Sequence, residues 1–187
     1  WNVSFMITVP TAISALMQRP VDADISTLKT AFSGSSPLPV ELFKRFEKAT
    51  GIEIVEGYGL TEVTCLVSCN PDQGLKKIGS VGIPLPHTNV KVLLDTANGP
   101  EECAANEIGE ICVESPGVFA GNTYTEIAKN KDLYYFDTYL RTGDLGRMDK
   151  DGYLWITGRA KDLIIRGGHN IDPVSYTHLR AHETKPN

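Results

Sequence analysis

Hydrophobic residues in the first third of the chain fall into short runs that alternate with helical stripes. The runs Val3–Val9 and Leu28–Phe32 are rich in strand-forming residues and have the length of buried strands. Between them, the spacing of apolar side chains predicts a helix over Ala12–Gln18, with Thr11 as its cap and Pro20 beyond its end. This part of the chain therefore predicts a strand, a helix and a second strand.

A second helix is predicted from Pro39 onward, and its pattern is the clearest in the sequence. Pro39 suits the first turn and Gly51 follows the last one. The run Ile52–Val55 then predicts another strand. An alternation of strands and helices in this order is typical of a parallel α/β layer. The apolar stripe of the second helix is expected to comprise Leu42, Phe43, Phe46 and Ala49.

After about residue 75 the helical periodicity disappears and short alternating runs separated by Gly, Pro, Asn and Asp take its place. Lys150–Gly152 has the composition of a tight turn between two strands. The fold class is therefore α/β, with a parallel layer followed by a β-rich subdomain. The strands predicted here are Val90–Leu94, Ile108–Val113, Gly146–Asp149 and Tyr153–Thr157.

Composition narrows the class of protein without pointing to an activity. The 187 residues are 41% hydrophobic and 22% charged, which excludes a wholly disordered, collagen-like or disulfide-dense chain. A net charge of −5 gives no basic surplus, so no nucleic-acid partner is expected. The four cysteines are expected to be reduced and to hold no zinc.

The amino-terminal segment is uncharged over its first 18 residues, but polar residues interrupt it and no basic segment precedes it. We therefore expect neither an export signal nor a transmembrane segment, and a cytoplasmic location. Because the chain starts at Trp1, we expect it to be an internal piece of a longer protein.

Three glycine-containing segments combine charged and hydroxyl residues near predicted strands. In the first, Gly57–Glu62, paired glycines permit close approach of a ligand and Tyr58 offers a stacking face. Thr61 supplies a hydroxyl, and Glu62 an oxygen ligand of the kind that Mg²⁺ takes beside phosphates. The alternative is a structural turn in which Thr61 caps a helix.

The second and third segments are Arg141–Leu145 and Gly158–Ile171. Asp144 could accept hydrogen bonds from both hydroxyls of a ribose, or could simply bond backbone amides in a turn. Arg159 presents a planar fork suited to phosphate or ribose oxygens, or could belong to a surface cluster on an edge strand.

Taken together, the segments resemble the adenylate-forming, or AMP-binding, enzymes over roughly residues 1–173. The run Gly168–Pro173 is most similar to that of bacterial-type fatty acyl-CoA synthetases. The resemblance implies a distorted barrel for the β-rich part, followed by a hinge and the first strand of a small C-terminal domain. The motifs that carry it are Val9–Thr11, Ser33–Pro37, Gly57–Glu62, Gly79–Pro84, Gly109–Ile111, Arg141–Leu145 and Gly158–Asp162.

The resemblance implies an adenosine site. Tyr58 would pack against adenine between Gly57 and Gly59, Asp144 would bind the ribose hydroxyls, and Arg159 would contact the ribose–phosphate end. The loop Ser33–Pro37, with Gly34, Ser35 and Ser36, would line the edge of the adenine.

The resemblance also implies catalytic and coenzyme contacts. Thr61 would touch the α-phosphate of ATP, and Glu62 would hold Mg²⁺. Lys161 would be the hinge of the small domain, and Gly168 would lie beside the pantetheine of coenzyme A.

The implied reaction joins a carboxylic acid to coenzyme A at the expense of ATP, through an acyl-adenylate. The apolar run Val63–Val67 suits a fatty acid as pocket lining, although it could equally be core. Two other functions stay open: an adenylation domain that loads an amino or aryl acid onto a carrier protein, and a non-catalytic nucleotide-binding relic.

The predicted organisation has four parts. The tail departs from the family pattern, and two expected lysines, one in a phosphate loop and one near the C-terminus, lie outside the sequence. The 187 residues alone are therefore expected not to catalyse adenylation. The parts are 1–75 in the α/β subdomain, 76–157 in the β-rich subdomain, 158–173 at the hinge and start of the small domain, and 174–187 as a tail of doubtful origin.

Overall fold

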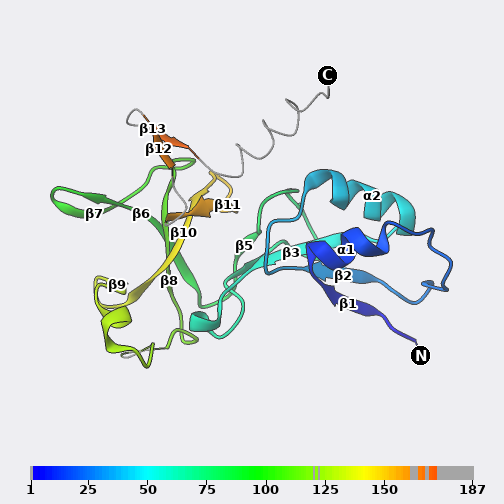
Figure 1. The fold of residues 1–187 in the computed structure, drawn as a ribbon, viewed down its shortest axis with the longest axis horizontal. Coiled ribbons are helices and arrows are strands. Elements are labelled where there is room, and N and C mark those ends of the chain that lie inside the picture. Colours follow the sequence, from blue (N-terminus) through cyan, green and yellow to red (C-terminus); the bar gives the residue numbers. More distant parts are fainter. Residues whose placement is uncertain (1, 120, 122, 161–163, 167–168, 172–187) are drawn as a thin grey trace, which may run out of the picture.

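The computed structural model describes residues 2–119, 121, 123–160, 164–166 and 169–171. Two sheets account for most of this structure, and the two α-helices lie on the first of them (Figure 1). The first sheet and its helices comprise β1 (Phe5–Thr8), α1 (Pro10–Leu16), β2 (Thr30–Ser33), α2 (Val40–Thr50), β3 (Ile54–Tyr58), β4 (Ser68–Cys69) and β5 (Ile83–Pro84), with the 3₁₀ turn η1 (Thr61–Val63) between β3 and β4.

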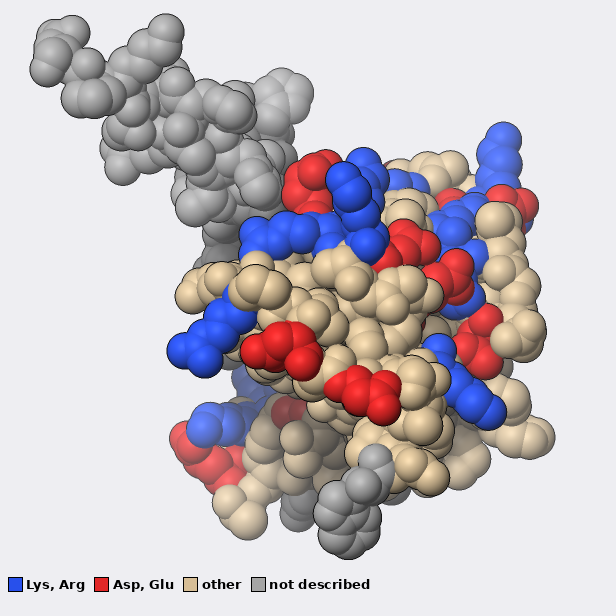
Figure 2. Space-filling view, turned by 90° about the vertical axis from the view of Figure 1, so that its right-hand side faces the viewer, with Lys and Arg blue, Asp and Glu red and all other residues tan. Residues whose placement is uncertain are grey.

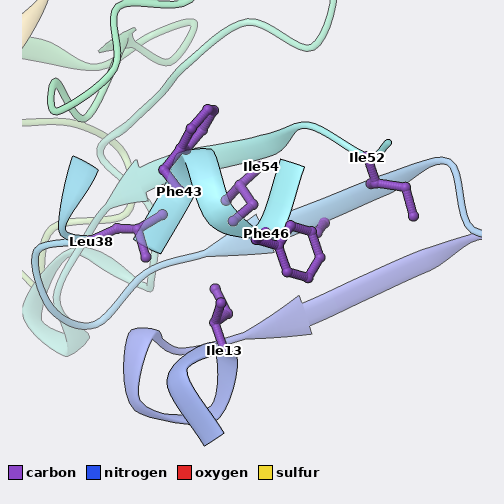
Figure 3. Close-up of a cluster of buried hydrophobic side chains, with 7 residues drawn as sticks. Ile13, Leu38, Phe43, Phe46, Ile52 and Ile54 are labelled. Carbon is purple, nitrogen blue, oxygen red and sulfur yellow. The ribbon is translucent and has the colours of Figure 1, made fainter. Parts of the chain in front are cut away.

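The first three strands run parallel, as the alternation of strands and helices predicts. Phe5 of β1 lies opposite Thr30 of β2, and Ala31 of β2 lies opposite Ile54 of β3. Both helices pack on the same face of this layer, where one buried cluster unites them (Figure 3). The cluster comprises Ile13, Ala31, Leu38, Phe43, Phe46, Ile52 and Ile54.

Helix α2 confirms the clearest sequence prediction. Phe43 and Phe46 are buried, and Gly51 ends the helix in the left-handed region at a φ of 70°, which a glycine adopts without strain. Ala49 was expected in the apolar stripe, but it lies on the exposed side. The stripe is therefore narrower than predicted, since one turn of Phe side chains already fills the space over the sheet.

Helix α1 begins one residue before its predicted cap. Its first residue is Pro10 and its N-cap is Val9, so Thr11 lies inside the helix and makes no capping hydrogen bond. Proline fits a first helical position because its φ is already fixed and its missing N–H has no partner there. The prediction that Thr11 caps the helix is wrong.

Strand β3 extends further than predicted and takes in part of the first glycine segment. Gly57 and Tyr58 pair with Cys69 and Ser68 of β4, which lengthens the strand beyond Val55. The two glycines of the segment thus differ in setting: Gly57 lies in the strand and Gly59 lies after it.

The second sheet is antiparallel in the order β11-β10-β8-β6-β7, and β9 pairs with β10. Its core also takes Val63 and Val67 from the turn after β3, which joins it to the first sheet. The elements are β6 (Asn89–Thr96), β7 (Gly99–Glu102), β8 (Gly109–Glu114), the 3₁₀ turn η2 (Ile127–Asn130), β9 (Tyr134–Tyr135), β10 (Tyr139–Met148) and β11 (Leu154–Arg159). A separate antiparallel hairpin comprises β12 (Ile164–Arg166) and β13 (His169–Ile171).

Strand β10 is much longer than the predicted strand Gly146–Asp149. Its register shifts between Arg141 and Leu145, and Gly143 has a φ of 73°, so alternation along the strand is interrupted. A bulge of this kind hides a strand from a pattern of period two. Asp144 therefore lies inside a strand, whereas the sequence suggested a strand end.

The segment between β4 and β5 connects the first sheet to the β10–β11 hairpin through ion pairs and backbone hydrogen bonds. Lys77 Nζ lies 2.6 Å from Asp149 Oδ2 and 2.7 Å from Asp151 Oδ2. Two backbone hydrogen bonds, from Val81 to Leu154 and from Leu154 to Gly82, extend the contact. These bonds join the β4–β5 segment to the β10–β11 turn and to the start of β11.

Charged side chains of both signs are mixed on the face of the molecule shown in Figure 2. On α2, for example, Lys44 pairs with Glu41 across one helical turn. Neither helix in the described part of the chain has the length and apolar character needed to cross a membrane.

Candidate functional site

Asp144 of β10 lies between Tyr58 of β3 and Arg159 of β11. The Tyr58 hydroxyl donates to Asp144 Oδ2 at 2.7 Å, and Arg159 Nε lies 3.0 Å from Asp144 Oδ1. Asp144 is only 6% exposed, whereas the Arg159 side chain is 71% exposed. The structure thus brings together three of the residues that the sequence singled out, although 86 positions separate Tyr58 from Asp144.

The bulge in β10 holds Asp144 in place. The Thr142 hydroxyl donates to the Ile111 carbonyl at 2.8 Å and accepts from the Asp144 amide at 3.1 Å. The Gly143 amide donates to Glu110 Oε1 at 3.1 Å. These bonds satisfy the backbone groups that the interrupted ladder leaves free, so the carboxylate is presented on a rigid support.

Burial raises the pKa of Tyr58 far above its ordinary value, and the negative charge of Asp144 raises it further. The hydroxyl therefore stays protonated and keeps donating to the carboxylate at every physiological pH. Tyr58 acts here as a fixed hydrogen-bond donor that orients Asp144.

An open cleft of about 450 Å³ lies at the carboxyl ends of β1, β2 and β3. In open parallel sheets this edge is where ligands bind. Four residues of the predicted adenosine site line it, and Ser36 lies exposed in the same loop without being part of the lining. The lining comprises Ile7, Thr8, Val9, Ala12, Phe32, Gly34, Ser35, Gly57, Gly59, Cys65 and Leu66.

Two glycines of the cleft leave no room for a side chain. A Cβ on Gly57 would lie 2.7 Å from the ring of Phe32, and a Cβ on Gly59 would lie 1.6 Å from the carbonyl oxygen of Cys65. Any other residue would displace the walls of the cleft. The requirement for glycine here is therefore steric, in addition to the close approach of a ligand that the sequence suggests.

The apolar run Val63–Val67 divides between core and cleft. Val63 and Val67 are buried in the core of the second sheet, whereas Cys65 and Leu66 line the cleft. The core interpretation thus holds for Val63 and Val67, while lining of a fatty-acid pocket by Cys65 and Leu66 stays a prediction.

Thr61 and Glu62 lie in η1, four residues or fewer beyond Tyr58. Leu60 precedes the turn in an extended conformation, and Thr61 is exposed and caps no helix. Glu62 Oε1 accepts a hydrogen bond from the Tyr124 hydroxyl at 2.5 Å. Within the described residues no hydrogen bond or ion pair joins Glu62 to Asp144. The predicted residues therefore fall into two groups: Tyr58 with Asp144 and Arg159, and Glu62 with its own partner.

Tyr124 was not singled out by the sequence. It lies in a polar stretch without periodicity, and nothing in that pattern indicates a partner 62 positions away. The hydrogen bond to Glu62, with burial as the lesser cause, raises the pKa of Tyr124 to about 12. The hydroxyl is therefore a donor to Glu62 at neutral pH.

Glu62 offers a single carboxylate, which suits a magnesium ion only where the ion is bound together with a nucleotide. Among the described residues no group of three or more His, Cys, Asp or Glu side chains could hold a metal alone. Mg²⁺ is usually bound by one or two carboxylates plus the phosphates of its substrate. A single acid such as Glu62 can supply the carboxylate, and the nucleotide supplies the phosphates. Glu62 keeps its second carboxylate oxygen without a protein partner among the residues described.

Glu56, also missed by the sequence, is a buried acid in β3. It is 6% exposed, and Oε2 accepts a hydrogen bond from the Gly79 amide at 3.2 Å. Burial raises its pKa from 4.5 to about 7, against the opposing effect of the Gly79 amide. Lys161 and Gly168, predicted for the hinge and the coenzyme, lie outside the described residues, as does the tail 174–187.

Comparison with known proteins points in one direction. Residues 1–122 match the family model described as AMP-binding enzyme. The marinolic acid–CoA ligase of Pseudoalteromonas sp. (strain SANK 73390) is 42% identical over 177 residues, which cover 93% of this chain and 27% of that protein. The long-chain-fatty-acid–CoA ligase of Bacillus subtilis (strain 168) is 40% identical over 166 residues, covering 88% and 29%.

A third relative, the sulfoacetate–CoA ligase of Cupriavidus necator, is 38% identical over 172 residues, covering 91% of this chain and 33% of that protein. Among solved structures, the ATP-bound MatB of Rhodopseudomonas palustris superposes with a TM-score of 0.83 at 34% identity. The match covers 92% of this chain and 34% of that one. The chain thus spans about a third or less of the length of the proteins it resembles.

Proposed function

Because the chain belongs to the AMP-binding enzyme family, we propose that it forms the adenosine- and metal-binding part of an AMP-forming acid–CoA ligase. The observation that carries the proposal is the buried carboxylate of Asp144, held by Tyr58 and Arg159 beside the edge of the parallel layer. A fixed carboxylate of this kind is suited to a diol such as the 2′- and 3′-hydroxyls of ribose.

Asp144 has acceptor capacity left for a ribose. A carboxylate offers about four lone-pair sites, and Tyr58 and Arg159 occupy two of them. Because Arg159 is mostly exposed, its guanidinium could also turn toward the ribose–phosphate end of the nucleotide. The three side chains together would fix the sugar, with Tyr58 packed against the adenine.

The cleft at the ends of β1–β3 would take the adenine and the reacting carboxylate. Gly57 and Gly59 present backbone without side chains, and the loop with Gly34, Ser35 and Ser36 would line the edge of the base. Positioning of this kind converts a bimolecular reaction into one between neighbouring bound groups.

In the proposed reaction, a carboxylate oxygen of the acid attacks the α-phosphorus of ATP, and pyrophosphate leaves. The thiol of coenzyme A then attacks the acyl carbonyl of the adenylate, loses its proton, and AMP leaves. Thr61 would donate to the α-phosphate, and Glu62 would hold Mg²⁺, which when bound offsets the charge of the phosphate oxygens. Lys161 would lie at a hinge and Gly168 beside coenzyme A.

A fatty acid is the substrate we propose. The apolar part of the cleft, with Ile7, Val9, Ala12 and Leu66, suits an aliphatic chain and offers no charge to a zwitterionic amino acid. The relatives act on acids as different as long-chain fatty acids and sulfoacetate, so chain length and class are the quantities to measure.

A hydroxamate-trapping screen tests the function in a full-length protein that carries this sequence. Fatty acids of increasing length, aryl acids and amino acids are each supplied with ATP and Mg²⁺. ATP-dependent hydroxamate from fatty acids, strongly reduced in D144N at low ATP, supports the proposal. Product from amino acids alone indicates an adenylation domain, and no product from any acid indicates a nucleotide-binding relic. The 187-residue chain alone is expected to give no pyrophosphate–ATP exchange.

A further inference from the structure

Glu62 is engaged through both its side chain and its backbone by a single stretch of chain that approaches from the second sheet. The Tyr124 hydroxyl donates to Glu62 Oε1 at 2.5 Å, and the Phe119 amide donates to the Glu62 carbonyl at 3.1 Å. The side chain of Glu62 therefore has one of its two carboxylate oxygens fixed by a neutral donor.

The backbone of Tyr124 is itself held by one side chain. Asn130 Oδ1 accepts from the Tyr124 amide at 2.8 Å, and Asn130 Nδ2 donates to the Tyr124 carbonyl at 2.7 Å. A primary amide that bonds both groups of one residue reproduces the pairing that a strand partner would give. The backbone of Tyr124 is thus held independently of Glu62.

The stretch that leads to Tyr124 also contacts η1 and the residue that follows it, through Gly117. The Thr64 hydroxyl donates to the Gly117 carbonyl at 2.6 Å, and a Cβ on Gly117 would lie 2.8 Å from the Val63 carbonyl oxygen. The close approach of the two segments brings Tyr124 within reach of Glu62. Each of these contacts restrains the position of the 117–124 segment relative to Glu62.

We propose that Tyr124 is a positioning residue for the metal-binding carboxylate: it holds Glu62 Oε1 so that Oε2 is the oxygen offered to Mg²⁺. The inference rests on the proposed function, in which Glu62 binds the ion together with ATP. In this role Tyr124 would act through its hydrogen bond to Glu62 rather than as a ligand of the ion.

A hydrogen bond of this kind affects metal binding by limiting the rotamers of the ligating side chain. An unrestrained glutamate samples several rotamers, and only some of them direct an oxygen to a given point. Partners that orient a ligating side chain typically contribute about 10- to 100-fold to metal affinity. Loss of the hydroxyl alone, in Y124F, is therefore expected to weaken metal binding about 10-fold.

The experiment measures Mn²⁺ binding by electron paramagnetic resonance in the presence of ATP, using a full-length protein that carries this sequence. Wild type, Y124F, E62Q and the double variant are titrated with Mn²⁺. We expect Y124F to raise the dissociation constant about 10-fold, E62Q to raise it further, and Y124F to add nothing in the E62Q background. In pyrophosphate–ATP exchange, excess Mg²⁺ should restore the rate of Y124F but not that of E62Q.

Y134F is the matched control, because it removes a hydroxyl that is hydrogen-bonded to the same stretch from β9 and makes no contact with Glu62. Tyr134 donates to the Phe119 carbonyl at 2.5 Å and contacts the Thr123 hydroxyl at 2.7 Å. Equal weakening of Mn²⁺ binding in Y134F and Y124F would mean that Mn²⁺ affinity depends on how well the stretch is ordered and not on the Tyr124–Glu62 hydrogen bond. That result would overturn the inference.

Two other results are separable. If E62Q binds Mn²⁺ as wild type does, the proposed metal role of Glu62 fails, and the inference fails with it. If E62Q is impaired and Y124F is not, only the inference fails. Should Y124F unfold, N130A provides the same test, since it keeps the hydroxyl but frees the Tyr124 backbone, and a rise in the dissociation constant of about 3-fold is expected. An unchanged constant in N130A would then contradict the inference.

Discussion

Asp144 and Arg159 lie opposite each other in the antiparallel pairing of β10 with β11, and Arg159 Nε lies 3.0 Å from Asp144 Oδ1. The two partners differ in burial, because the carboxylate is enclosed while the guanidinium extends into solvent. An enclosed acid with an exposed cationic partner is well arranged to exchange that partner for a ligand. This asymmetry leads to two different expectations for the two residues.

Replacement of Asp144 by Asn is expected to weaken AMP binding about 10- to 100-fold. Asn keeps the shape and can still accept from Tyr58, but it loses the charge, and charge-assisted hydrogen bonds contribute about 1.5–3 kcal/mol. Isothermal titration with AMP measures the change, and thermal unfolding checks that D144N is folded. D22N, at an exposed aspartate, is the control. Equal AMP affinity in D144N and wild type would remove Asp144 from the nucleotide site.

Replacement of Arg159 by Ala separates stability from binding. Because the Arg159 side chain is 71% exposed, its ion pair should change the free energy of unfolding by less than about 0.5 kcal/mol. AMP affinity should nevertheless fall about 10-fold, since the guanidinium fork suits phosphate and ribose oxygens. Urea unfolding and AMP titration of R159A measure the two quantities, and R159K should recover part of the affinity. A large loss of stability with unchanged affinity would assign Arg159 a purely structural role.

Local patterns predicted the strands of the parallel layer and helix α2 because the signals for these elements lie within their own segments. The Phe43 and Phe46 spacing, and Gly51 after the last turn, specify α2 from within its own segment. Strand β7 was not predicted, since Gly99–Glu102 contains no strand-forming residue and is ordered only by pairing with β6. Strand β10 was cut short by its bulge, which breaks the alternation that identifies strands.

The candidate site was predicted residue by residue, but its contacts could not be. Tyr58 and Asp144 were each chosen for their chemistry, and only the topology of the two sheets brings the hydroxyl to the carboxylate. Tyr124 and Glu56 carry no local signal, because the role of the first depends on a distant acid and the burial of the second depends on the packing of the Gly79 segment. Long-range contacts of this kind are absent from spacing and composition.

Replacement of Gly59 by Ala is expected to lower stability by about 3 kcal/mol or more and to abolish nucleotide binding. The added Cβ would lie 1.6 Å from the Cys65 carbonyl oxygen, which belongs to backbone and cannot move aside alone. Urea unfolding measures the loss. G99A is the matched control: Gly99 has a φ of 112° and no atom within 4 Å of the position that a Cβ would take, so only backbone strain of about 1–2 kcal/mol is expected. Equal losses of unfolding free energy in both variants would show that the backbone around Gly59 moves to make room for the added Cβ.

Glu56 is expected to make the protein less stable as the pH rises from about 4.5 to about 7. In the folded protein burial raises its pKa from 4.5 to about 7, so over this range the folded state retains a proton that the unfolded state has released. The free energy of unfolding therefore falls with rising pH, by up to about 3 kcal/mol, and the contribution levels off above pH 7. E56Q stays neutral and can still accept from the Gly79 amide, so it should lack this slope.

Urea unfolding of wild type and E56Q at pH 4, 5.5, 7 and 8 measures this contribution, because the remaining titratable groups are common to both proteins. The stability of E56Q relative to wild type should increase steadily up to pH 7 and then stay constant. E41Q, at a helix α2 carboxylate that is 89% exposed, should run parallel to wild type throughout. Parallel curves for E56Q and wild type would mean that the pKa of Glu56 is the same in the folded and unfolded states, with the Gly79 amide fully offsetting the effect of burial.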